Sequence, residues 1–101
     1  MRIKIALIMF ALLVCHAAYA QAWQYFDNAK ILSIVQWQGS NPVLIEVAPN
    51  TYCSIGPEDK TNIALVMTLY SSGRRANFHC HPTAVNVGGL NGYPIHRIIA
   101  R

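Results

Sequence analysis

Residues 74–83, RRANFHCHPT, carry the residue types that most readily do chemistry. Two histidines flank Cys80, and two arginines precede them. Such residues suit a zinc site with imidazole and thiolate ligands, or a nucleophilic cysteine with a histidine base. They also suit an ordinary strand with polar side chains on its outer face. The elements that position these residues decide between the three interpretations.

The polarity of residues 74–81 alternates, which is typical of a strand with one buried face. One face carries Ala76, Phe78 and Cys80, and the other carries Arg75, Asn77, His79 and His81. Cys80 therefore points away from the histidines, which argues against a compact ligand triplet and against a Cys/His catalytic pair. A zinc site would have to use His79 and His81, about 7 Å apart along the strand, with His96 as a third ligand. We favour two exposed histidines on a solvated face.

The first twenty residues predict a secretory signal peptide. A short basic start precedes ten apolar residues, 5–14, which are too few to span a bilayer as a helix. Small residues at Ala18 and Ala20 predict cleavage before Gln21. We therefore expect a secreted or periplasmic protein without a membrane span, in which a single domain covers residues 21–101.

Cleavage would leave a small, weakly basic domain with two cysteines. Six Lys and Arg side chains against four Asp and Glu give a net charge of +2, compared with +4 for the whole chain. Export and this modest charge both argue against a nucleic-acid partner. Cys15 would leave with the signal peptide; lipid attachment to it is less favoured, because Val14 is larger than the residue such sites usually carry.

The remaining cysteines, Cys53 and Cys80, allow a single disulfide, which an oxidising compartment favours. Small exported domains commonly need such a covalent cross-link, because their hydrophobic cores are small. Closing this loop is expected to contribute about 3.5 kcal/mol in the chain-entropy description.

Five strands and one helix are expected along the domain. Residues 21–29 form an aromatic lead-in that docks through Trp23 and Phe26, and residues 82–92 form a loop with three glycines. The strands are expected at 30–38, 43–48, 51–55, 74–81 and 93–101.

The helix is expected at 59–72, where the hydrophobic period changes. Its apolar residues recur at i, i+3, i+4 and i+7, namely Ile63, Val66, Met67 and Tyr70. Glu58 or Asp59 can accept hydrogen bonds at its start, and Gly73 can end it. The resulting order, β-β-β-α-β-β, predicts a mainly β fold. It is the order of a small five-stranded OB-fold-like Greek-key barrel with one helix between strands 3 and 4. An α+β sheet with one helix is the alternative.

The domain offers little for catalysis. A hydrolase needs a positioned nucleophile, base and orienting acid, whereas each of the four carboxylates of the domain suits a structural position. Glu58 and Asp59 suit a helix start, Glu46 the outer face of a hairpin, and Asp27 the lead-in. The segment GGLNG, 88–92, lacks the lysine and following helix of a phosphate-binding loop. We therefore expect neither an enzyme nor a cofactor.

Several features together resemble a known family. They are Trp23, Cys53, the helix end and basic strand start ALVMTLYSSGRR (64–75), Cys80, and IHRI (95–98). The chain resembles a family of small exported OB-fold proteins that are similar to the binding subunit of subtilase cytotoxin and related to the binding subunits of AB5 toxins. This resemblance implies a pentameric ring and glycan binding, with catalysis left to a separate subunit.

The sequence thus predicts an exported, non-catalytic binding module whose partner is a glycan. The alternatives are a periplasmic protein-interaction or inhibitor protein and a small metal-binding exported protein. Trp37 or Tyr93 could supply an aromatic surface, although packing in the core or rim explains both. The candidate binding face consists of Arg74, Arg75, His79, His81 and Arg97.

Overall fold

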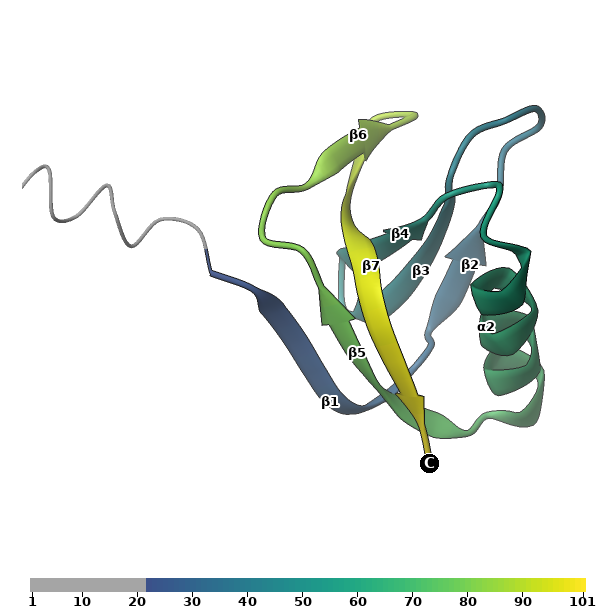
Figure 1. The fold of residues 1–101 in the computed structure, drawn as a ribbon, viewed down its shortest axis with the longest axis vertical. Coiled ribbons are helices and arrows are strands. Elements are labelled where there is room, and N and C mark those ends of the chain that lie inside the picture. Colours follow the sequence, from purple (N-terminus) through teal and green to yellow (C-terminus); the bar gives the residue numbers. More distant parts are fainter. Residues whose placement is uncertain (1–21) are drawn as a thin grey trace, which may run out of the picture.

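The computed structural model describes residues 22–101 (Figure 1). The predicted signal peptide and its cleavage site at Ala18, Ala20 and Gln21 lie outside the described residues. The described part is mainly β with one helix. Its elements are β1 (Gln24–Lys30), β2 (Ser33–Val35), β3 (Val43–Ala48), β4 (Thr51–Ile55), α2 (Lys60–Ser72), β5 (Arg75–Cys80), β6 (Val85–Val87) and β7 (Leu90–Ala100).

The strands form one sheet in the order β1-β5-β7-β4-β3-β2, with β6 paired to β7. The described residues therefore contain seven strands where the sequence predicted five. Of the expected strand at 30–38, only Lys30, which ends β1, and residues 33–35 of β2 are in strands, because the chain already forms β1 in the supposed lead-in. The expected loop at 82–92 contains β6 and the start of β7. The terminal strands β1 and β2 are not paired with each other, so the sheet is not closed.

The long strand β7 changes partners along its length. Residues 90–92 pair antiparallel with β6, residues 92–94 pair parallel with β4, and residues from 95 onward pair antiparallel with β5. The change falls at Pro94, which has no N–H to donate to a ladder. Its carbonyl accepts a hydrogen bond from the backbone of His81 at 2.8 Å. At Gly92 a Cβ would lie 2.5 Å from Leu44 Cδ2, so glycine permits the close approach of β7 to β3.

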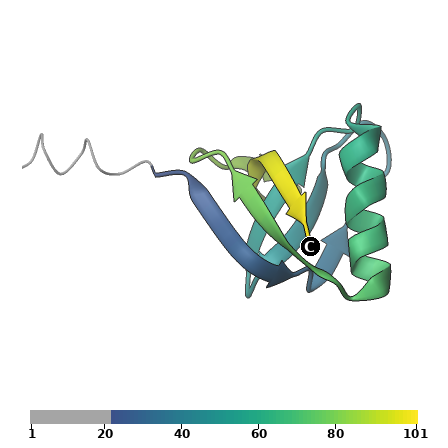
Figure 2. The ribbon, with the colours of Figure 1, turned by 60° about the horizontal axis from the view of Figure 1, so that its bottom comes forward.

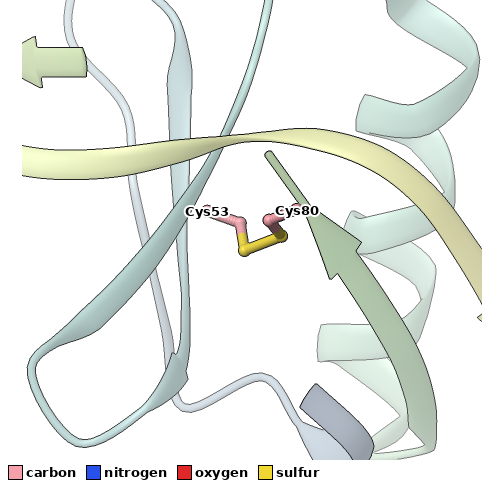
Figure 3. Close-up of a disulfide and its surroundings, with 2 residues drawn as sticks. All are labelled: Cys53 and Cys80. Carbon is pink, nitrogen blue, oxygen red and sulfur yellow. A yellow bond between two sulfur atoms is a disulfide. The ribbon is translucent and has the colours of Figure 1, made fainter. Parts of the chain in front are cut away.

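A disulfide joins Cys53 on β4 to Cys80 at the end of β5, as the sequence predicted (Figure 3). These strands are not neighbours, because β7 lies between them. In a flat sheet, strands two places apart would be separated by roughly 9.5 Å. The two Cα atoms are only 6.4 Å apart. The sheet therefore bends sharply around β7, and the two cysteines meet on its inner side.

The core fills the concave side of this bent sheet. Its fully buried members include Ile45, Ile55, Phe78 and the disulfide. Leu44 points to the opposite face of β3 from Ile45 and is buried there as well, against Gly92 of β7.

The helix α2 stands to one side of the strands in both ribbon views (Figure 2). Asp59 caps its start by accepting a hydrogen bond from the backbone of Asn62, and Gly73 ends it in the left-handed conformation, at φ 66°. Val66 and Leu69 are buried, whereas Tyr70 of the predicted stripe is 46% exposed. The core-facing stripe is thus rotated toward Leu69. No helix within residues 22–101 is long and apolar enough to cross a membrane.

Glu46, on the outer face of β3, makes hydrogen bonds to β2 and to the turn that follows β3. The backbone N–H of Asn50 donates to Glu46 Oε2 at 2.9 Å, and the hydroxyl of Ser33 donates to Oε1 at 2.8 Å. Both hydrogen bonds favour the carboxylate. They hold the pKa of Glu46 below its ordinary value of 4.5, and the Asn50 bond has the larger effect.

Removing the disulfide should destabilise the fold strongly. Reduction frees a loop whose ends are 27 residues apart, so we expect a loss of about 3.5 kcal/mol. The disulfide is first reduced under denaturing conditions. Urea unfolding at pH 7 then compares the reduced protein, kept under reducing conditions, with the oxidised protein. Reduction changes no side chain other than the cysteines. Equal unfolding midpoints would contradict the expectation.

Glu46 should contribute to stability only above the pH at which its carboxyl is protonated. Because its pKa is lower in the folded state, the stabilisation is complete above its unfolded pKa, near 4.5. It is lost as the pH falls through the lower folded value. Glu46→Gln should therefore have a lower free energy of unfolding than the natural protein at pH 6, and this difference should shrink toward pH 3. Urea midpoints measure this, with the exposed Glu58→Gln as the matched control; a deficit independent of pH would argue against it.

Candidate functional site

The outer face of β1, β5 and β7 brings together most of the predicted polar residues. In the ladder, Tyr25 on β1 lies opposite His79 on β5, which in turn lies opposite Arg97 on β7. The three side chains form a row across the sheet, because residues opposite one another in antiparallel strands share a face.

A bulge in β7 adds His96 to this neighbourhood. His79 is opposite Arg97, but Cys80 is opposite Ile95, so β7 has one residue more than β5 at this point. That extra residue is His96. Bulges of this kind re-aim a side chain relative to strict alternation. They also explain why Ile95 packs against the core while Arg97 and Ile99 are exposed.

Trp23 stacks against the imidazoles of His81 and His96. The ring centroids of Trp23 and His81 are 4.7 Å apart, and those of Trp23 and His96 are 5.0 Å apart. The two imidazoles are 5.3 Å from each other in an edge-on arrangement. These contacts hold the indole in place, yet Trp23 remains 42% exposed. Part of the indole is therefore available to a ligand.

Tyr25, Asp27 and Arg97 surround His79. The rings of Tyr25 and His79 meet edge to face at 4.7 Å. Arg97 Nη2 lies 3.2 Å from His79 Nδ1, and Asp27 Oδ1 lies 3.5 Å from His79 Nε2. A guanidinium can only donate, so Nδ1 accepts and the proton of a neutral His79 is placed on Nε2, facing Asp27. His79 thereby orients the acid and the guanidinium on either side of it.

These side chains line an open cleft of about 520 Å³. Its lining consists of Trp23, Tyr25, Asp27, His79, His96 and Arg97. Tyr25 is 60% exposed, and the side chain of Asp27 is 67% exposed. The cleft thus offers two aromatic surfaces, a carboxylate acceptor and a guanidinium donor to one ligand.

The predicted binding face is divided between two places. His79 and Arg97 line the cleft, and His81 lies beside it against Trp23. Arg75 lies at the opposite end of β5 from His79, about 13 Å along the strand, and Arg74 directly precedes it. There Arg75 Nη1 donates to the carbonyl of Asn28 at 3.0 Å. Asn77, expected on the outer face between the two places, is only 8% exposed.

The burial of Asn77 has a specific cause in β1. This strand has one extra residue between Phe26 and Ala29, where Asn28 adopts a positive φ of 50°. The bulge leaves the Asn28 N–H without a ladder partner, and Asn77 Oδ1 accepts it at 2.8 Å. Asn77 therefore acts as a structural residue of the bulge.

His79, His81 and His96 do not assemble into a metal centre. Within residues 22–101, no group of three or more His, Cys, Asp or Glu side chains is arranged to hold a metal ion. His79 is engaged by Arg97 and Asp27, whereas His81 and His96 pack against Trp23. Cys80 is buried in the disulfide.

Sequence reasoning missed the aromatic half of the cleft. The sequence predicted only a lead-in for Trp23, Tyr25 and Asp27. The docking expected there is made by Trp23 on the histidines and by Phe26 on the core. The signal was present: these three residues recur at every second position, as outward residues of a strand do. Trp37 and Tyr93 pack elsewhere, Trp37 over Gly88 and Tyr93 against the core.

The cleft therefore combines chemical groups suited to a polar ligand with a flat apolar face. Aromatic rings stack on such a face, and the acid and guanidinium bind hydroxyl, carbonyl or charged oxygen atoms. No protein-family model and no curated protein matches this chain.

Proposed function

We propose that residues 22–101 are an OB-fold-like barrel. Only residues 31 and 32 separate β1 from β2, although these strands lie at the two ends of the strand order. Taken together, they are one bent strand that supplies both edges of a nearly closed sheet, and β1 also contacts β3. The parallel pairing of β4 with β7 and the bend at the disulfide favour the same architecture.

We further propose that this protein is an exported, non-catalytic module that binds carbohydrate in the cleft. The observation that carries the proposal is the pair of exposed aromatic rings, Trp23 and Tyr25, beside a carboxylate and a guanidinium. A sugar ring has an apolar face that stacks on aromatic side chains and hydroxyl groups that need directed partners. Asp27 accepts from hydroxyl groups, and Arg97 donates to ring, carbonyl or carboxylate oxygens.

The arrangement is pre-organised for binding. His79 contacts Arg97 at hydrogen-bond distance and lies 3.5 Å from Asp27, and two imidazoles pack against the indole of Trp23. Side chains that are already ordered lose less entropy when a ligand binds. OB-type barrels also bind oligosaccharides on an exposed face. The resemblance to toxin binding subunits agrees with this ligand class and extends the proposal to a ring of identical subunits.

Removing one aromatic ring from the cleft should weaken binding sharply. A glycan array identifies the sugar, and titration calorimetry with that sugar then compares variants. We expect Tyr25→Ala and Trp23→Ala to lower affinity about tenfold, a loss of about 1.4 kcal/mol, because each substitution removes an aromatic surface on which the apolar face of the sugar stacks.

The matched control is Tyr70→Ala, which removes an exposed tyrosine from α2, outside the cleft. This variant should keep the natural affinity. Equal losses for Tyr25→Ala and Tyr70→Ala would place the sugar elsewhere. The protein-interaction alternative would replace this proposal under two conditions together. The glycan array would show no reproducible binding, and a captured partner protein would no longer bind the Tyr25→Ala variant.

A further inference from the structure

Four cations that the cleft does not use gather at one end of the sheet. They are Lys30, Arg74, Arg75 and Arg101, and we refer to them as the basic end. All four are exposed. Lys30 lies directly opposite Arg75 in the pairing of β1 with β5, and its side chain reaches Gly73 at the end of α2.

Hydrogen bonds hold the three guanidiniums of the basic end in place. Arg75 donates to the carbonyl of Asn28 at 3.0 Å, and Arg101 Nε donates to Asn77 Oδ1 at 3.1 Å. Arg74 donates to the main-chain oxygen of Arg101. A guanidinium has five N–H donors, so each keeps donors beyond the one that fixes it.

No aspartate or glutamate neutralises the basic end within residues 22–101. Asp27 lies in the cleft, with Oδ1 3.5 Å from His79 Nε2. Glu46 is engaged by Ser33 and Asn50. Glu58 and Asp59 lie at the opposite end of α2, about 20 Å from its last residue along the axis.

This arrangement costs stability by itself. Like charges directly opposite each other in a sheet repel, as Lys30 and Arg75 must. The carbonyl end of α2 carries a partial negative charge that offsets some of this repulsion. It does not supply the oxygen ligands that four cations can take. A bound anion would supply them.

We propose that the basic end binds the phosphate or sulfate groups of a soluble polyanion. Arginine recognises such groups with two parallel hydrogen bonds, and three fixed guanidiniums beside a lysine suit a multiply charged ligand. The fixed geometry favours a localised ligand over a charged membrane surface, which attracts cations without regard to their arrangement. This site does not depend on carbohydrate binding in the cleft.

The test uses inositol hexakisphosphate and a sulfated oligosaccharide as soluble probes, with phosphatidylglycerol vesicles as the membrane arm. Binding is measured at low salt for the natural protein, Lys30→Gln and Lys60→Gln. The two variants lose the same charge, but Lys60 lies at the start of α2. We expect at least one soluble probe to bind, Lys30→Gln to weaken it about tenfold, and Lys60→Gln to leave it unchanged.

Thermal unfolding of the variants checks that Lys30→Gln weakens binding by removing a contact with the ligand, and not by destabilising the fold. Because this substitution relieves repulsion by Arg75, it should not lower the melting temperature. Tyr25→Ala, which damages the cleft, should leave polyanion binding intact, so failure at one site is distinguishable from failure at the other. Equal losses for the two lysine variants, binding to vesicles alone, or no binding to either soluble probe would overturn the proposal.

Discussion

The shape of this protein depends on a close approach between two strands that are not neighbours. The bond between Cys53 and Cys80 holds β4 and β5 closer than a flat sheet allows, so β7 must lie at the crest of a sharp bend. The bend turns one side of the sheet inward around Phe78 and the aliphatic core, and it turns the opposite side of β1, β5 and β7 toward solvent. Both candidate binding regions lie on that convex side.

Two bulges then determine which side chains meet on the convex side. The extra residue in β7 places His96 beside His81, and the extra residue in β1 brings Lys30 onto the same face as Tyr25, opposite Arg75. Asn77 fills the gap in β1 from the neighbouring strand. One sheet face is in this way divided into an aromatic region and a basic region, with a buried amide between them.

Sequence patterns predicted the elements whose signals are local. The ranges 43–48 and 51–55 match β3 and β4, and the helix begins and ends where Asp59 and Gly73 indicated. The pairing of the cysteines followed from their number. The bulges could not be predicted, because they depend on the register of neighbouring strands, and one inserted residue moves every later side chain to the other face. The cleft was missed for this reason, and because the sequence pattern predicted an aromatic lead-in of the domain instead of the strand β1.

Complete burial of the two sulfur atoms also affects their chemistry. Thiol–disulfide exchange requires a thiolate to reach a sulfur atom in line with the bond, and both cysteines are 0% exposed. A small thiol can therefore attack only when β4 or β5 separates from the core. For a given reductant, the rate of reduction in native solution would therefore report how often the fold opens. Once oxidised, the folded chain would keep its cross-link through a passing exposure to reducing conditions.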